Sequence, residues 1–108
     1  MLNFPLIIFD GCDIDFHNTE ASLIKSIEWL EVQQGIYTVY DYLGYPLHLT
    51  LDTRREVHLN QDRTEPAMRH LLCSRLRECL IRHYKDAVVP DDPEQVLKMA
   101  MEFYDVYG

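Results

Sequence analysis

Three aspartates and a histidine lie within eight residues near the start of the chain, in residues 9–17 (FDGCDIDFH). Carboxylate and imidazole groups at this density could bind a divalent cation or transfer protons. Asp13, Asp15 and His17 occupy alternate positions, so in a strand they would share one face at a spacing of about 7 Å. One hypothesis is therefore a small metal-dependent enzyme or metal-binding domain that uses these three side chains.

Two catalogued motifs fit this stretch poorly. An apolar run ending in Asp10 resembles the opening of haloacid-dehalogenase-type phosphatases, but those enzymes carry a second aspartate where this chain has Cys12. A calcium loop would need a glycine and a distal glutamate that do not follow Asp13 and Asp15. We therefore favour a second interpretation, in which the row is the solvated face of a hairpin whose turn is Asp10-Gly11.

The remaining histidines offer one further candidate site. His48 and His58 lie on strand-like segments and could face each other across a hairpin, where a carboxylate would complete a zinc site. We expect the histidines to be scattered over the surface instead. The chain has no G-x-S-x-G motif, and its four glycines are dispersed rather than gathered in a phosphate loop. The sequence thus predicts no catalytic residue, no bound metal and no cofactor.

The hydrophobic pattern indicates the elements that would position these residues. Residues 4–9 form an apolar run and residues 12–17 alternate, which is typical of two strands. A helix is expected from Asn18 or Thr19 to about residue 32. Further strands are predicted at 36–41, 45–52 and less clearly 55–59, and further helices at 64–84 and 92–107. We predict a single α+β domain over residues 1–108, with an antiparallel sheet of four to five strands built from hairpins and about three helices packed on one face.

The charge is unevenly distributed along an acidic chain of net charge −8. Residues 1–53 carry eight acids against Lys25 alone, residues 54–85 are net basic, and residues 86–108 are again acidic. Net negative charge repels phosphate backbones, so we do not expect a nucleic-acid partner, although the basic segment could contact an anionic ligand. No apolar run approaches the length of a membrane span, and the first residues lack the charges of a secretory signal.

Cys12, Cys73 and Cys79 are odd in number and include no C-x-x-C pair. They fit neither a disulfide framework nor a zinc-finger spacing. We therefore expect reduced cysteines and a cytoplasmic protein.

Aromatic residues suggest a protein interface. Tyrosine combines apolar area with a polar tip and is enriched in binding hot spots. The acidic residues would steer a basic partner, and the aromatic residues would supply contact area. The predicted partner-binding residues are Asp13, Asp15, Trp29, Tyr37, Tyr40, Tyr42 and Tyr45. Cross-strand pairing within the sheet is the competing explanation for the tyrosines.

The segment EVQQGIYTVYDYLGYPLHL, residues 31–49, is similar to a pattern found in small acidic bacterial proteins of unassigned function, x-V-E-N-G-x-Y-x-x-Y-D-x-x-G-x-x-L. The matching positions are Val32, Gly35, Tyr37, Tyr40, Asp41, Gly44 and Leu47, whereas Gln33-Gln34 replaces the acid–Asn pair. Some bacterial proteins of this size and charge are immunity proteins, which neutralise a basic toxin domain by covering it. The resemblance implies such a binding role and no catalytic residue.

The leading hypothesis is a non-enzymatic cytoplasmic protein-binding domain with a basic protein partner. The alternative is the metal-dependent domain that uses Asp13, Asp15 and His17, or His48 and His58. Self-association into a homo-dimer through the two later helices is a third interpretation.

Overall fold

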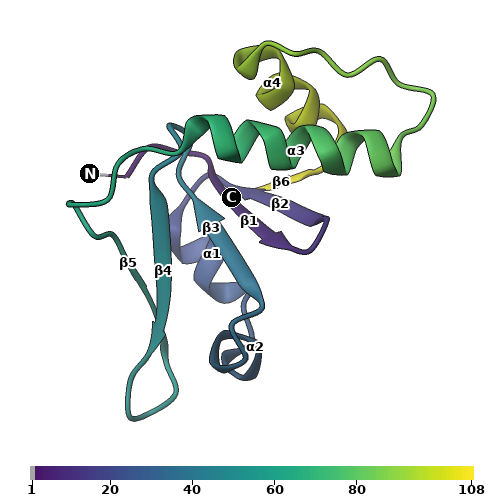
Figure 1. Cartoon of the computed structure of the whole chain (residues 1–108). Coiled ribbons are helices and arrows are strands. Elements are labelled where there is room, and N and C mark those ends of the chain that lie inside the picture. The colour runs from purple at the N-terminus through teal and green to yellow at the C-terminus, as the bar shows by residue number, and fades with distance from the viewer. Residues whose placement is uncertain (1) are drawn as a thin grey trace.

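The computed structural model describes residues 2–108. Within them, six strands form one sheet and four helices pack around it (Figure 1). The strands are β1 (Leu6–Asp10), β2 (Asp13–His17), β3 (Tyr37–Tyr40), β4 (Pro46–Leu51), β5 (Val57–Asn60) and β6 (Asp105–Tyr107). The helices are α1 (Glu20–Lys25), α2 (Trp29–Gln33), α3 (Arg69–His83) and α4 (Pro93–Phe103). The α+β class is confirmed, with more strands and helices than predicted.

The sheet is mixed, so the prediction of a purely antiparallel sheet is wrong. The strand order is β5-β4-β3-β1-β2-β6, and β6 runs parallel to β2 while the other neighbours are antiparallel. Helix α4 ends at Phe103, and Tyr104 is extended, so the chain turns onto the outer edge of β2. The helix predicted to residue 107 is therefore shorter, because the backbone groups on that edge of β2 need partners.

The predicted hairpins are present with small shifts. β1 and β2 pair antiparallel, and their two-residue loop is Gly11-Cys12 rather than Asp10-Gly11, with Gly11 at φ 61°. A turn closes at residues 41–44, where the Gly44 N–H donates to the Asp41 carbonyl at 3.0 Å. Gly44 has φ 90°, a backbone conformation that side chains rarely adopt.

The helix predicted from residue 18 to 32 is split into α1 and α2. Thr19 caps α1 by accepting a hydrogen bond from the Ser22 N–H, as expected. The Ser26 hydroxyl donates to the Leu23 carbonyl, which satisfies the end of α1. Ile27 is buried in the core, and the backbone is extended at Glu28, the residue before α2.

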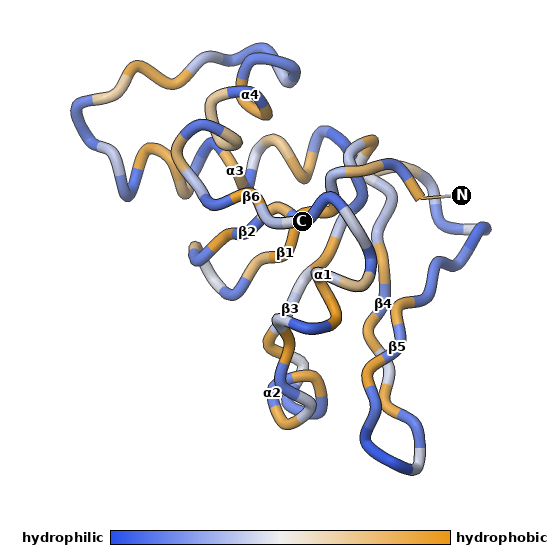
Figure 2. The backbone as a smooth tube through the Cα atoms, turned by 180° about the vertical axis from the view of Figure 1, so that it is seen from behind, coloured by the Kyte–Doolittle hydropathy of each residue, from blue (hydrophilic) through white to orange (hydrophobic). Residues whose placement is uncertain are grey.

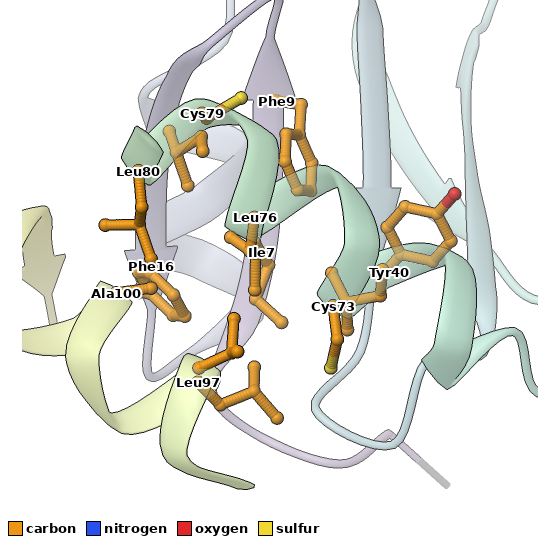
Figure 3. Close-up of a cluster of buried hydrophobic side chains, with 13 residues drawn as sticks. Ile7, Phe9, Phe16, Tyr40, Cys73, Leu76, Cys79, Leu80, Leu97 and Ala100 are labelled. Atoms are coloured by element: carbon orange, nitrogen blue, oxygen red, sulfur yellow. The ribbon is translucent and has the colours of Figure 1, made fainter. Parts of the chain in front are cut away.

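Helices cover both faces of the sheet, which corrects the prediction that they share one face. α3 and α4 pack on one face of β1 and β2, where Leu76, Leu80 and Leu97 meet Ile7 and Phe16 (Figure 3). On the opposite face, Leu23 and Ile27 pack with alternate residues of β1, β3 and β4. Figure 1 shows α3 in front of the sheet and α1 behind it. β1 is thus buried on both sides, which explains its uninterrupted apolar sequence.

α3 begins at Arg69, five residues later than predicted. The Met68 N–H donates to the Gly44 carbonyl at 2.7 Å, so the 41–44 turn meets the first turn of α3. Leu71 lies on the outer side of α3 and is exposed.

A disulfide joins Cys12, in the β1–β2 loop, to Cys79 in α3, with a Cα–Cα distance of 5.3 Å. The prediction of three reduced cysteines is therefore wrong. The sequence offered no C-x-x-C signal because the partners are 67 positions apart and meet only through the packing of α3 on the hairpin. Cys73 is buried with a free thiol, and desolvation by burial raises its pKa.

The β4–β5 hairpin extends away from the rest of the fold, and its turn is hydrophilic (Figure 2). Over residues 2–108, no helix combines the length and apolar character needed to cross a membrane.

Candidate partner-binding site

Four aspartates lie side by side at the end of the sheet formed by β1, β2 and β6. Asp10 lies directly opposite Asp13 across the β1–β2 pair, and Asp15 lies directly opposite Asp105 across the β2–β6 pair. We call these four residues the acidic ridge. Among the ion pairs of residues 2–108, none involves a carboxylate of the acidic ridge.

This arrangement is electrostatically unfavourable for the isolated chain. Like charges directly opposite in neighbouring strands destabilise a sheet, by up to about 1 kcal/mol per pair. Desolvation raises the pKa of Asp15, and the neighbouring carboxylates of Asp105 and Asp13 add to this effect, whereas His17 opposes it. The acidic ridge therefore holds negative charge that the fold itself does not neutralise.

His17 does not belong to a solvated row, contrary to the prediction for this face of the strand. Its side chain is 1% exposed and stacks on the Tyr107 ring, with centroids 5.2 Å apart. Its Nδ1 lies 2.8 Å from the Ser22 hydroxyl, and its Nε2 lies 3.4 Å from the Ser26 hydroxyl. Burial lowers the pKa of His17, although the nearby Asp15 acts in the opposite direction.

A hollow of 410 Å³ adjoins one side of the acidic ridge. Asp13, Asp15 and Asp105 of the acidic ridge are among its lining residues. The other lining residues are Cys12, Ile14, His83, Tyr84, Phe103 and Tyr104, from the β1–β2 loop, β2 and the ends of α3 and α4. We call this the acidic–aromatic hollow.

Contacts within the fold hold the aromatic side of this hollow in place. The rings of Tyr84 and Phe103 meet edge to face, with their centroids 4.7 Å apart. The Tyr104 ring also meets the Tyr84 ring edge to face, with a centroid distance of 6.0 Å. The Tyr84 hydroxyl donates to the Phe103 carbonyl at 3.0 Å, and the Tyr104 hydroxyl lies 3.3 Å from His83 Nδ1. Desolvation, with contributions from Tyr84 and Asp13, raises the pKa of Tyr104 to about 12.

A smaller hollow of 130 Å³ lies on the other side of the ridge, between Asp10, Asp13, Asp15, Ser26 and Tyr37. The Tyr37 hydroxyl donates to the Glu31 carboxylate. Desolvation and this hydrogen bond raise the pKa of Tyr37 to about 12. Of the predicted tyrosines, Tyr37 is thus the one that the fold places beside Asp13 and Asp15.

The other predicted aromatic residues are engaged elsewhere. Tyr40 is 4% exposed and packs edge to face on Phe9, so it belongs to the core and is not available to a partner. The Arg55 guanidinium covers the Trp29 ring at 4.4 Å. Tyr42 lies under Arg69, and Tyr45 is half-buried in the turn before β4. The sequence-predicted set is therefore not one surface.

The histidine pair predicted across the β4–β5 hairpin is displaced. His48 is aligned with Asn60, and His58 with Thr50, so the two histidines are not opposite each other. His48 contacts Glu65 instead, and His58 Nε2 lies 2.9 Å from the Asp52 carboxylate.

In the described part of the chain, there is a single place where three or more histidine, cysteine or acidic side chains lie close enough to hold one metal ion. This group is Asp52, Glu56 and His58. All three are exposed. The hydrogen bond with His58 lowers the pKa of Asp52, and the hydrogen bonds that Asp52 accepts from the N–H groups of Glu56 and Arg54 act in the same direction. The hydrogen bonds within the turn therefore account for the position of Asp52.

Sequence reasoning missed Tyr84, Phe103, Tyr104 and Asp105 as members of the site. Asp105 was assigned to a helix, and its place opposite Asp15 depends on the parallel β6 pairing. A signal was present in the alternation of Asp105, Val106 and Tyr107 at the end of the chain, which is compatible with a strand.

No family model, no curated protein and no solved structure matches this chain.

Proposed function

We propose that this chain is a non-enzymatic protein-binding domain that uses the acidic ridge to bind a basic protein partner. The supporting observation is the cross-strand placement of Asp10 opposite Asp13 and of Asp15 opposite Asp105, without ion pairs from the described residues. Such pairs cost stability, and proteins commonly retain unfavourable features where function needs them. Cationic groups of a partner would relieve the repulsion on binding.

The charge distribution gives the binding mechanism. A surface of one sign steers an oppositely charged partner toward it and raises the association rate, with an effect that salt screens. The aromatic residues beside the ridge supply area that a partner could bury, and the edge strand β6 keeps Asp105 at the surface. Residues of the ridge and these aromatic residues line the same hollow at the edge of the sheet, so a partner that covers this edge could contact both.

We further propose a role of the immunity type, in which the partner is a basic toxin domain that the chain covers. The support is the acidic charge of the chain and the resemblance over residues 31–49. In the structure, the matching Asp41 and Gly44 form the turn that contacts α3, and the matching Tyr40 is buried. The resemblance thus concerns the framework of the fold, while the acidic ridge carries the binding proposal.

The test is capture of the partner by the immobilised protein from extracts of the cells that produce it. The wild type should retain a basic protein at low salt and release it at high salt. The double variant Asp13→Asn/Asp105→Asn should retain much less of the same protein. A control variant with the same change of charge, Glu56→Gln/Glu78→Gln, alters exposed acids away from the ridge and should bind as the wild type does.

Equal capture by the ridge variant and the control variant would contradict the proposal. So would a partner whose retention does not change with salt, because the ridge acts through charge. Circular dichroism of both variants would establish that each is folded before binding is compared.

A further inference from the structure

The two cysteines of the Cys12–Cys79 disulfide lie in different surroundings. Cys79 is 4% exposed and lies on α3 among the buried side chains of the core (Figure 3). Cys12 is only partly buried, in the two-residue loop between β1 and β2, and it is among the residues that line the acidic–aromatic hollow. Cys12 is therefore the half of the disulfide that a reagent from solvent reaches more easily.

A guanidinium group contacts the Cys12 side of the disulfide. A guanidinium nitrogen of Arg82 lies 3.9 Å from Cys12 Sγ, to which it donates a hydrogen bond. Among the ion pairs of residues 2–108, none involves Arg82. A neighbouring cation favours the thiolate form of a cysteine, which is the form that attacks a disulfide and also the form that leaves from one. The contact therefore favours Cys12 as the sulfur that carries negative charge once the bond opens.

Two acids near the disulfide act in the opposite direction. Asp13 directly follows Cys12, and Glu78 directly precedes Cys79. Both acids are exposed, so water and salt screen their charges. Arg82 is exposed as well, but its guanidinium contacts the sulfur directly, and charge interactions weaken with distance. We therefore expect the effect of Arg82 on Cys12 to be favourable and small.

The fold offers a way to open this bond without unfolding. The strands β1 and β2 are joined by their own backbone pairing, and Leu76 of α3 shares a buried cluster with Ile7 of β1. These contacts do not depend on the crosslink. Gly11, beside Cys12, is exposed, and the space around it is open. Reduction would therefore release the β1–β2 loop from α3 and leave the sheet and the core in place.

We infer that Cys12–Cys79 is an exchangeable disulfide in which an external thiol attacks Cys12, and in which Arg82 stabilises the Cys12 thiolate. The chemical class of the reaction partner is a dithiol. This inference goes beyond the proposed binding function and does not depend on it.

The exchange takes two steps and moves two electrons from the dithiol to the protein. In the first step, one thiolate of the dithiol attacks Cys12 Sγ, the bond between the two cysteines breaks, and Cys79 leaves as a thiolate that takes up a proton from water. In the second step, the other thiolate of the dithiol attacks the dithiol sulfur that is bound to Cys12. Cys12 then leaves as a thiolate beside Arg82, and the dithiol becomes a cyclic disulfide.

The first test identifies the sulfur that is attacked, in the folded and oxidised Cys73→Ala protein, which lacks the third cysteine. Glutathione is added without denaturant, the reaction is quenched with acid, and N-ethylmaleimide in denaturant then labels the freed thiol. Mass spectrometry of the peptides should find glutathione mainly on Cys12 and the maleimide on Cys79. Dithiothreitol should reduce the bond completely under the same native conditions, and the circular dichroism spectrum of a folded protein should be retained.

The second test measures the contribution of Arg82 in Cys73→Ala/Cys79→Ser, where Cys12 is the single cysteine. Its rate of alkylation by iodoacetamide, a neutral reagent, is measured at pH 7. Adding Arg82→Met should slow alkylation by about twofold to fivefold, the range for the loss of an exposed charge interaction. The control Lys85→Met removes an exposed positive charge just beyond the end of α3 and should leave the rate unchanged.

A matched variant compares the two cysteines. Cys73→Ala/Cys12→Ser leaves Cys79 as the single cysteine, and its alkylation should be slower than that of Cys12 by about tenfold or more, because buried thiols react poorly. Circular dichroism of each variant would establish that it is folded. The glutathione experiment retains the disulfide and does not depend on the stability of the single-cysteine variants.

Three results would overturn the inference. Glutathione could be found on Cys79 as often as on Cys12, or dithiothreitol could reduce the bond only in denaturant, and in either case Cys12 is not the point of attack in the folded protein. Equal alkylation rates for the Arg82→Met and Lys85→Met variants would remove the role of Arg82. These measurements leave the acidic ridge intact, so their failure is distinguishable from failure of the proposed function, which the capture experiment decides.

Discussion

The Nδ1 atom of His17 lies 2.8 Å from the hydroxyl of Ser22, five residues further along the chain. The opposite ring nitrogen faces Ser26, whose hydroxyl donates its proton to the Leu23 carbonyl. Nε2 therefore acts as the donor to Ser26, and Nδ1 accepts from Ser22. This network suits a neutral imidazole, and it fastens β2 to α1.

We expect stability to fall as the pH decreases from about 6.5, the ordinary pKa of histidine, because of His17. Its folded-state pKa is lowered, so between that value and the ordinary one the unfolded chain binds more protons. The stabilising contribution is thus complete above the unfolded pKa and is lost as the pH falls through the folded one. Asp15, the acid that faces His17, has a raised pKa in the folded state. It therefore favours the folded state as the pH falls toward 3.8, the ordinary pKa of aspartate, and this effect is opposite in sign to that of His17.

Urea denaturation from pH 8 to pH 5 would measure this effect. The slope of unfolding free energy against pH should be steeper in the wild type than in His17→Asn. The control His70→Asn alters an exposed histidine and should keep the wild-type slope. Parallel slopes for the wild type and His17→Asn would show that His17 does not cause the pH dependence.

Neutralising the acidic ridge should stabilise the isolated protein. Asp13→Asn removes the repulsion with Asp10, and Asp105→Asn removes that with Asp15. Each change should raise the free energy of unfolding by about 0.5 kcal/mol, or the melting temperature by about 2–4 °C. Added salt should stabilise the wild type more than these variants, since screening already weakens the same repulsion. Thermal melts at two salt concentrations would decide this, and a lower melting temperature for both variants would refute it.

The disulfide should account for a large share of the total stability. Closing a loop between residues 67 apart is expected to contribute about 4 kcal/mol by restricting the unfolded chain, and measured values are often 2–4 kcal/mol. Cys12→Ser/Cys79→Ser should therefore lower the free energy of unfolding by about 2–4 kcal/mol. A reducing agent should bring the wild type to the level of this variant and leave the variant itself unchanged. Cys73→Ala, the control, should retain the response to the reducing agent.

Gly44→Ala should be strongly destabilising. A Cβ atom at position 44 would lie 2.4 Å from the backbone nitrogen of Arg69, and φ there is already 90°. The combined steric and conformational penalty is about 2–4 kcal/mol, because backbone atoms cannot move aside cheaply. Gly35→Ala is the matched control, with φ 68° but open space around the added methyl, and should cost only about 1 kcal/mol. Chemical denaturation of both variants gives the comparison, and equal losses would contradict the contact with α3.

The sequence patterns predicted local structure better than assembly. The strand at residues 12–17 and the Thr19 cap each depend on neighbours in the chain, and both are found in the structure. The turn between the first two strands is also present, but it lies at Gly11-Cys12, one residue later than predicted. The short apolar run before Asp10 predicted a strand, but it did not predict that both faces of this strand are covered. Burial on both faces follows only from helices that arrive from distant parts of the sequence.

The candidate site shows the same division. Asp13 and Asp15 were predicted to belong to a binding surface because their charge and spacing are local properties, and the structure leaves Asp13 exposed and Asp15 half-exposed. Their aromatic neighbours were chosen from the nearby tyrosine-rich hairpin, but Tyr84 and Tyr104 reach them through the packing of α3 and α4. The disulfide was missed for the same reason, since spacing along the chain does not reveal the contact between α3 and the β1–β2 loop.

The Cys12–Cys79 bond also determines how the molecule would respond to mechanical force. Tension applied at the two ends would pass directly from residue 12 to residue 79 through the disulfide. The covalent loop between them, which contains β2, α1, α2, β3, β4, β5 and most of α3, would bear no load. An unfoldase or a narrow pore that pulls on either terminus would have to admit two segments of unfolded polypeptide side by side when it reached the disulfide. The oxidised chain should therefore stall at a point that the reduced chain passes freely.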